Sequence, residues 1–193
     1  MISPAPPAVI AVAIRVGLGF LVCFAVACGA PPRSASGTER SAPRPPGPEA
    51  PPLELPDIAG RHVALSELRG RPVIVNFWAT WCQPCRRELP SLEELHRRFE
   101  PAGLRVLAVS IDADPQELDR FVADASIPFV VLRDPEGKAA AAYGVTTVPS
   151  TFLVDAAGRV SERIDGEVDW GREDLLGEVQ RLLAEAGPAD DQP

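Results

Sequence analysis

The pattern of apolar and polar positions divides the chain into a polar, proline-rich beginning and a later part in which strands and helices alternate. The clearest strand covers residues 73–79, which are apolar at nearly every position, as expected for a central strand covered on both faces. A helix is predicted from residue 82 to about residue 100, because apolar side chains recur there at the spacing of one helix face, at Leu89, Leu92, Leu95 and Phe99.

The remaining periodic segments predict the rest of an α/β domain. Further strands are expected over residues 62–65, 104–111, 129–132, 151–154 and 160–164, and further helices over 138–143 and 170–186. One more helix is expected to start at Asp114–Pro115, where an N-cap residue precedes a first-turn proline. The turn residues at 155–158 join the last two strands as a hairpin. The order predicts a βαβαβ half and a ββα half, hence a mixed central sheet with helices on both faces.

Residues 1–28 have the pattern of a bacterial export signal. Arg15 supplies a positive charge, and the apolar run over residues 16–27 has the length of a signal peptide rather than of a membrane span. Ala25-Val26-Ala27-Cys28 is similar to a lipobox, in which the cysteine is diacylated, although its first position holds alanine where that motif prefers leucine. We favour lipidation of Cys28; a cleaved signal without a lipid and a retained signal anchor are the alternatives.

Composition suggests the domain boundaries and argues against one class of partner. Residues 29–52 are rich in Pro, Ser, Ala and Gly and are expected to form a flexible tether, since they have too little apolar surface to offset the entropy of ordering. The folded domain is predicted over residues 53–187, with a disordered tail over 188–193. A net charge of −8 argues against a nucleic-acid partner, because binding to phosphates needs basic patches.

Two cysteines stand at the junction between the apolar strand and its helix, in Trp81-Cys82-Gln83-Pro84-Cys85. The first N–H groups of a helix have no partner within the helix, and its dipole adds partial positive charge there. Both effects favour a thiolate, so Cys82 is expected to have a lowered pKa and to be the exposed, attacking thiol. Cys85 lies one turn later, within disulfide reach, and is expected to be the buried, resolving thiol. The pattern predicts a protein that exchanges disulfides.

A structural zinc site is the alternative use of such a cysteine pair. Tetrahedral zinc in structural sites takes four protein ligands. The other cysteine expected in the mature protein is Cys28, the histidines are His62 and His96, and no spacing completes a ligand set. Redox chemistry is therefore favoured, and neither a metal nor another cofactor is expected.

The layout resembles the thioredoxin superfamily, and within it the exported, membrane-tethered reductases of the ResA, TlpA and CcmG type. The resemblance rests on Phe-Trp-Ala-Thr-Trp-Cys-Gln-Pro-Cys at residues 77–85 and on Val-Thr-Thr-Val-Pro-Ser-Thr-Phe at residues 145–152, and it covers about residues 53–186. The extra strand and helix at about 112–143, between the two halves, resemble the insertion of this subfamily. The resemblance implies a thioredoxin-like fold and a thiol-disulfide oxidoreductase.

The resemblance also bears on two polar residues near the cysteines. Glu88 falls within the apolar arc of the helix, so its carboxyl should be partly desolvated with a raised pKa, and reductases of the ResA type place a functional glutamate at the matching position. Glu88 is expected to shuttle the proton of Cys85; a carboxylate that reaches solvent at the rim is the alternative. Asn76 stands where ordinary thioredoxins carry a buried aspartate, and it is expected to satisfy buried backbone groups.

A second segment of the family motif implies the substrate-binding side of the site. The proline that matches Pro149 is cis in this superfamily and faces the cysteines, and the exposed backbone of Val148 is then able to pair with an extended substrate. Trp81, next to the attacking cysteine, is expected to offer the target an apolar contact. Trp78 and Trp170 are expected to serve packing.

The residues between the cysteines bear on the direction of the reaction. Strong oxidants hold a very stable thiolate, often with the help of a histidine, and Gln83-Pro84 supplies no such cation, so a reductase is favoured. The resemblance implies action on the periplasmic side of a bacterial membrane, with a thiol transporter of the DsbD or CcdA type as electron donor and an exported disulfide, such as that of apocytochrome c, as acceptor.

Two other functions stand as alternatives. The first is a disulfide oxidase or isomerase, which uses the same chemistry in another direction. The second is a copper metallochaperone without enzymatic activity. Thioredoxin-like metallochaperones carry a Cys-x-x-x-Cys pair and a distant histidine ligand, whereas this chain has two residues between its cysteines and no histidine after His96.

Overall fold

A computed structural model of the chain describes residues 47–187. The predicted export signal, the predicted lipidation site Cys28, most of the predicted tether and the predicted tail at 188–193 lie outside the described residues. Within the described range, no helix combines the length and the apolar composition needed to cross a bilayer.

The centre of the fold is a mixed sheet with the strand order β5-β4-β3-β6-β7. Its strands are β3 (Val73–Trp78), β4 (Arg105–Ser110), β5 (Val130–Arg133), β6 (Ser150–Val154) and β7 (Val160–Asp165). β4 is parallel to its neighbours β3 and β5, while β6 is antiparallel to its neighbours β3 and β7. The predicted mixed sheet is confirmed, and β3 is its central strand, with every residue buried.

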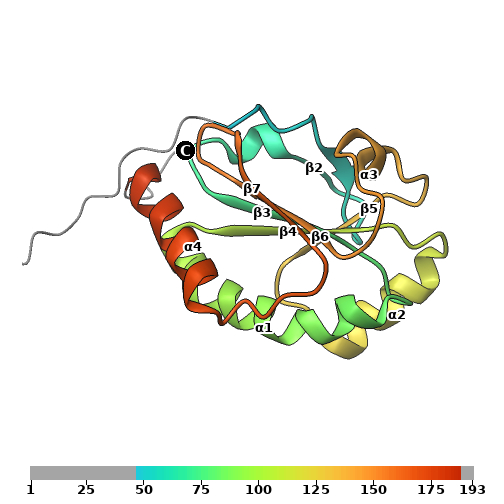
Figure 1. Cartoon of the computed structure of the whole chain (residues 1–193). Helices are drawn as coiled ribbons and strands as arrows, with labels where there is room; N and C mark the ends of the chain where they lie inside the picture. The colour runs from blue at the N-terminus through green and yellow to red at the C-terminus, as the bar shows by residue number, and fades with distance from the viewer. Residues whose placement is uncertain (1–46, 188–193) are drawn as a thin grey trace, which may run out of the picture. The chain divides into compact units, whose positions relative to one another are not determined.

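Helices cover both faces of the sheet, as predicted (Figure 1). One face carries α1 (Gln83–Phe99), α2 (Pro115–Ala125) and α4 (Glu173–Ala186). The other face carries α3 (Lys138–Ala142), a 3-10 turn (Leu65–Leu68) and an antiparallel ribbon of β1 (Glu54–Pro56) and β2 (His62–Ala64). A second 3-10 turn (Glu100–Ala102) follows α1. No strand is predicted before residue 62, because the three residues of β1 are too few to show an alternating pattern.

Two hydrophobic cores flank the sheet, because successive side chains of a strand point to opposite faces. The residues of β3 divide in this way: Ile74 and Trp78 join the core under α1 and α4, and Val73, Val75 and Phe77 join the core under α3. Asn76 lies between Ile74 and Trp78 in this alternation and therefore faces α1. A polar side chain is thus built into the larger core, directly below the helix that carries the cysteines.

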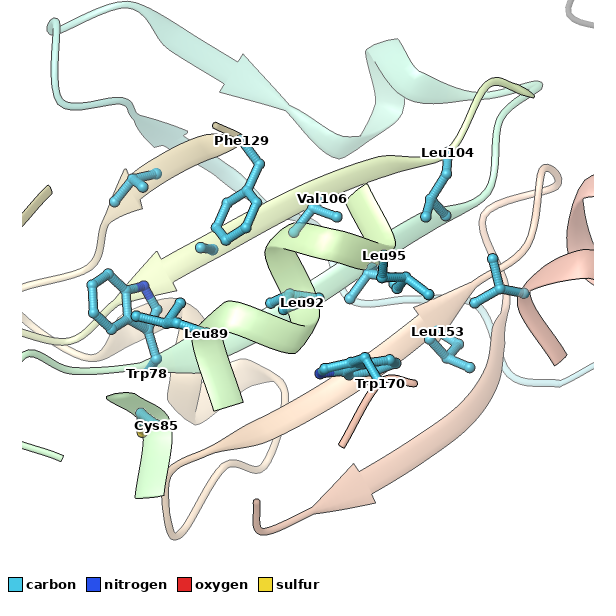
Figure 2. Packing of buried hydrophobic residues seen from close by; sticks show 14 of the residues in the cluster. Trp78, Cys85, Leu89, Leu92, Leu95, Leu104, Val106, Phe129, Leu153 and Trp170 are labelled. Carbon is cyan, nitrogen blue, oxygen red and sulfur yellow. The ribbon is translucent and has the colours of Figure 1, made fainter. Parts of the chain in front are cut away.

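Helix α1 contributes its predicted apolar face to the larger core. The buried residues of that face are Leu89, Leu92, Leu95 and Phe99. Figure 2 shows the leucines of α1 over the strands of the sheet, with Trp170 beside Leu153 of β6. Burial of one leucine stabilises a fold by about 1.5–3 kcal/mol, so packing offsets the cost of Pro90, which lacks an N–H inside the helix.

The last helix begins at Glu173, later than the predicted start at residue 170. Asp169 provides the reason, since its carboxylate accepts the N–H of Gly171 (2.9 Å) and its carbonyl oxygen accepts the N–H of Arg172 (3.2 Å). These bonds form a turn in front of the helix. Trp170 therefore lies in a loop, where its side chain is fully buried.

The described end of the predicted tether lies against the domain. The N–H of Val160 donates to the carbonyl oxygen of Pro48 (2.8 Å), and the hydroxyl group of Tyr143 donates to the carbonyl oxygen of Pro51 (2.9 Å). Gly47 also passes close to β7, because a Cβ at this position would lie 1.8 Å from the carbonyl oxygen of Val160. Contacts with the domain therefore begin before residue 53, the predicted boundary.

Candidate active site

A buried carboxylate holds the loop that leads into α1. Asp112, just beyond the end of β4, accepts hydrogen bonds from the N–H of Thr80 (3.0 Å) and from its hydroxyl group (2.7 Å). Ser110 donates a further hydrogen bond to the same carboxylate (2.7 Å). Since β3 and β4 are parallel neighbours, their carboxyl ends meet at one edge of the sheet, which brings Asp112 to Thr80. The role of Asp112 is not predicted from the sequence, although its place after the strand beside β3 points to this edge.

Cys82 caps the N-terminus of α1 and is bonded to Cys85. The Cys82 sulfur accepts a hydrogen bond from the N–H of Cys85 (3.2 Å), and the two residues form a disulfide with their Cα atoms 5.3 Å apart. Cys82 has the extended backbone of an N-cap residue (φ −81°, ψ 104°), and Pro84 lies in the first turn, where a missing N–H breaks no helical bond. After reduction, the same amide and the helix dipole favour a thiolate on Cys82.

Both cysteines are buried in this disulfide state. Cys82 is 5% exposed and Cys85 is 3% exposed, so the expectation that Cys82 alone is exposed is wrong here. The reason is the loop that contains Val148, whose carbonyl oxygen lies 3.6 Å from the Cys82 sulfur. Trp81, beside the pair, is 62% exposed and offers apolar surface next to the disulfide.

The loop over the disulfide contains a cis peptide bond between Val148 and Pro149, as the resemblance implies. Two hydrogen bonds shape this loop. The N–H of Gly166, at the end of β7, donates to the carbonyl oxygen of Pro149 (2.8 Å), and the hydroxyl group of Ser150 lies 2.8 Å from the carbonyl oxygen of Thr147. The loop is thereby held with the Val148 carbonyl group facing the disulfide.

Glu88 lies one turn after Cys85 on α1 and is only 3% exposed, so the alternative of a carboxylate at the solvent rim is wrong. Its Oε1 atom accepts a hydrogen bond from the indole N–H of Trp170 (2.7 Å). Its Oε2 atom is also buried and has no hydrogen-bond partner of normal geometry among the described residues. The carboxyl group thus has one oxygen held by the protein and one free to take a proton.

Burial raises the pKa of Glu88 to about 7, because the protein interior disfavours the charged form. The hydrogen bond from Trp170 opposes this rise in pKa, and the nearby backbone of Val168 opposes it to a smaller extent. The negative charge of Glu167 raises the pKa further. A carboxyl group with a pKa near neutrality is able both to accept and to release a proton at physiological pH. A proton shuttle for Cys85 requires this property.

Asn76 links Glu88 to strand β6. Its side-chain amide donates to the hydroxyl oxygen of Thr151 (2.8 Å), which stands opposite Asn76 in the register of β3 and β6. The same amide nitrogen lies 3.5 Å from Oε1 of Glu88, at the long limit for a hydrogen bond. Both partners are side chains, so the prediction that Asn76 satisfies backbone groups is wrong.

Trp170 has polar contacts in addition to the predicted packing. Besides the bond from its indole to Glu88, its backbone N–H donates to the hydroxyl oxygen of Ser91 (3.2 Å). No sequence pattern signals this contact, because 82 residues separate Trp170 from Glu88. Trp78 is a fully buried core residue, as predicted, and its indole N–H has no partner among the described residues.

Residues 47–187 contain no group of three or more His, Cys, Asp or Glu side chains placed to hold a metal ion. The two histidines lie in different parts of the domain. His62 is exposed on β2 and lies 3.9 Å from a carboxylate oxygen of Glu54, whereas His96 on α1 packs edge-on against the ring of Phe129.

Known proteins with similar sequences carry out disulfide exchange. A family model described as the AhpC/TSA family matches residues 46–163. The chain is similar to the thiol-disulfide oxidoreductase ResA of Bacillus thuringiensis, with 35% identity over 136 residues that cover 70% of this chain and 78% of that protein. It is also similar to ResA of Geobacillus thermodenitrificans, with 36% identity over 136 residues that cover 70% of this chain and 77% of that protein.

Solved structures share the same fold. A crystal structure from Chlorobium tepidum, described as a thiol:disulfide interchange protein DsbE, matches with a TM-score of 0.67 and 33% identity, over 72% of this chain and 98% of that chain. A solution structure from Neisseria meningitidis, described as a thioredoxin, matches with a TM-score of 0.65 and 27% identity, over 76% of this chain and 95% of that chain. The predicted thioredoxin-like fold is confirmed.

Proposed function

Because the chain belongs to the AhpC/TSA family of thioredoxin-fold proteins and is a thiol-disulfide oxidoreductase, we propose that it reduces disulfides in exported proteins. The observation that carries the proposal is the cysteine pair at the start of α1, where the Cys82 sulfur caps the helix beside its bonded partner Cys85. A peroxidase of the peroxiredoxin kind is not favoured, since the sequence has no Pro-x-x-x-Thr-x-x-Cys motif.

The charges around the cysteines support a reductant. A dithiol is a stronger reductant when its thiolate is less stabilised. Gln83-Pro84 places no cation between the cysteines. The two arginines that follow Cys85 have other partners, because Arg86 stacks over the ring of Phe121 and Arg87 pairs with a glutamate in the loop after β7. Neither arginine is therefore committed to a thiolate in the described structure.

In the proposed reaction, the Cys82 thiolate attacks one sulfur of the substrate disulfide and releases the other sulfur as a thiolate. Cys85 then gives its proton to Glu88 and attacks the Cys82 sulfur, which releases the second substrate thiolate and closes the Cys82–Cys85 disulfide. Two electrons pass from the protein to the substrate. The substrate thiolates take up two protons, one returned by Glu88 and one from solvent.

The proposed substrate-binding side consists of Trp81 and the Val148–Pro149 loop. An extended substrate segment would pair with the backbone of Val148, in the manner of a strand added to an edge. The exposed indole of Trp81 would contact an apolar side chain of the substrate. The 3.6 Å approach of the Val148 carbonyl oxygen to the Cys82 sulfur supports this assignment, because a segment bound there lies next to the attacking atom.

The reduction potential of the full chain tests the direction of the reaction. We expect a value below about −200 mV, nearer to that of thioredoxin at about −270 mV than to that of DsbA at about −120 mV. The chain is equilibrated with redox buffers of glutathione or dithiothreitol at stepped ratios, and the fraction with a closed disulfide is measured by mass spectrometry. A value near that of DsbA contradicts the reductase and supports an oxidase. Stoichiometric copper binding by the reduced chain supports the metallochaperone instead.

The proposed place of action is the periplasmic side of a bacterial membrane. This environment is kept oxidising, so an exported reductant needs electrons from across the membrane. The proposed donor is a membrane thiol transporter of the DsbD or CcdA type, and the proposed acceptor is a protein such as apocytochrome c, with an oxidised Cys-x-x-Cys-His motif.

The anchor is tested at the mature N-terminus. We expect the mature chain to begin at Cys28 and to carry a diacylglycerol group, because a small-residue site precedes this cysteine. Mass spectrometry of the N-terminal peptide measures the added mass. Cys28→Ser is the control, and it should lose both the lipid and the association with the membrane fraction. A wild-type N-terminal peptide without a lipid contradicts this anchor.

A further inference from the structure

We propose that Trp170 is a positioning residue for Glu88, which decides how tightly the carboxyl group holds a proton and which of its two oxygens receives it. The inference deepens the proposed function and rests on it for the role of Glu88 as proton acceptor for Cys85. The effect of Trp170 on Glu88 is separately measurable in the oxidised protein, in which Cys85 has no proton to give.

The indole N–H of Trp170 is fixed in place by the surrounding bonds. Its ring is fully buried, and its backbone N–H donates to the hydroxyl oxygen of Ser91 (3.2 Å). The hydroxyl group of Ser91 donates in turn to the backbone carbonyl oxygen of Glu88 (2.9 Å). In the same loop, Glu167 pairs with Arg87 of α1 (2.5 Å). The loop is thus tied to α1 at Trp170 itself and at Glu167, three residues before it, and the donor is held against the carboxylate.

The hydrogen bonds distinguish the two oxygens of Glu88. Oε1 accepts the indole N–H of Trp170 at 2.7 Å and has the amide of Asn76 at 3.5 Å. Oε2 is buried and has no hydrogen-bond partner of normal geometry among the described residues, although the backbone of Val168 lies near enough to the carboxyl group to lower its pKa slightly. A proton on Oε1 would compete with the Trp170 donor, whereas a proton on Oε2 leaves that bond in place. Trp170 therefore directs the incoming proton to Oε2.

Among the groups that face Glu88 from the elements packed against it, Trp170 stabilises the ionised carboxylate most strongly. Strands β3 and β6 contribute the neutral side chains of Asn76 and Thr151. The loop after β7 contributes Glu167, whose negative charge disfavours an ionised Glu88 and which Arg87 partly neutralises. The same loop contributes the backbone of Val168, which favours the ionised form less strongly than Trp170 does. The hydrogen bond from Trp170 is the largest contribution that lowers the pKa of Glu88, and its loss should raise that pKa.

Trp170→Phe tests this inference, because it removes the N–H and keeps an aromatic ring. We expect the pKa of Glu88 to rise above the wild-type value of about 7. The oxidised full chain is labelled with ¹³C in its glutamate carboxyl groups and titrated by NMR, with Glu88→Gln to assign the resonance. If Glu88 is the shuttle, less of it is ionised at pH 7 in Trp170→Phe, so disulfide exchange should be about three- to tenfold slower than in the wild type. The rate of disulfide exchange should return to that of the wild type at higher pH.

Two further variants separate the hydrogen bond from packing. Trp78→Phe is the matched control, since Trp78 is as deeply buried in the same core but its indole N–H has no partner within residues 47–187. This variant should leave the Glu88 titration unchanged. Trp170→3-benzothienylalanine keeps the shape of the indole and replaces its N–H with sulfur. This variant should therefore show the same rise in the pKa of Glu88 without leaving a cavity.

The possible outcomes distinguish this inference from the proposed function. A Glu88 titration that is unchanged in the benzothienyl variant overturns the inference, whatever the exchange rates are. A raised pKa supports the inference even if the exchange profile does not move, and in that case it is the shuttle role of Glu88 in the proposed function that fails.

Discussion

Cys85→Ser is expected to turn a protein that releases its substrates into one that stays bonded to them. The Cys82 thiolate still attacks a substrate disulfide, because its helix N-terminus and the backbone N–H of residue 85 are retained. No resolving thiol then lies within reach of the mixed disulfide. In the wild type Cys85 serves this purpose, since its Cα atom lies 5.3 Å from that of Cys82 in the closed disulfide. We expect turnover to fall by at least about a thousandfold, since the intramolecular attack has an effective concentration far above that of free thiols.

Capture of substrates is the measurement. Cys85→Ser is expressed in cells, the cells are acid-quenched, and disulfide-linked complexes are separated without reductant and identified by mass spectrometry. Cys82→Ser is the control, and it should capture far less because the remaining thiol of Cys85 lies within α1 and lacks the N-cap position, where the N–H of residue 85 favours a thiolate on Cys82. Complexes with proteins that carry Cys-x-x-Cys-His would support apocytochrome c as the acceptor. Equal capture by both variants, or by neither, contradicts the assignment of Cys82 as the attacking residue.

Glu88→Gln is expected to slow the resolution of the mixed disulfide by about a hundredfold at pH 7 while the first attack by Cys82 is kept. The amide keeps the shape of the carboxyl group and remains able to accept the Trp170 hydrogen bond, but it does not take the proton of Cys85. Rapid-quench measurement of the mixed disulfide separates the two steps. The wild-type rate should rise with pH near 7, the pKa of Glu88, and this dependence should disappear in the variant. Superimposable pH profiles for the two proteins rule out the shuttle.

The same variant has a stability effect of known sign. Folding raises the pKa of Glu88 from its ordinary value of 4.5 to about 7, so the folded chain binds this proton more tightly than the unfolded chain. The stabilisation that this provides is complete below pH 4.5 and is lost as the pH rises through about 7. Glu88→Gln has no such loss. The free energy of unfolding of this variant, relative to that of the wild type, should therefore increase as the pH rises from 4.5 through about 7, by up to about 3 kcal/mol. Urea denaturation at pH 5 and pH 8 measures the difference, and an equal effect at both values contradicts the burial of the charge.

Some elements of the fold were predictable because their signals are local. The apolar run of β3, the leucine spacing of α1 and the N-cap at Asp114 each lie within a single element, and each matches the structure. The start of α4 was not predictable, because the turn at Asp169 delays the first helical residue to Glu173 without changing the apolar spacing of the sequence. The short β1 was not predicted for a related reason, since three residues are too few to show an alternation of apolar and polar side chains.

The sequence by itself determined the cysteine pair at a helix N-terminus and the apolar face of α1 that carries Glu88 inward, since both depend on spacing within one helix. Only the tertiary structure decided which side chains hold that site. Asp112 meets Thr80, Asn76 meets Thr151, and Trp170 meets Glu88 across 32, 75 and 82 residues of chain. These contacts depend on strand order, on register and on the path of a loop, and no local periodicity encodes which distant donor will meet a buried carboxylate.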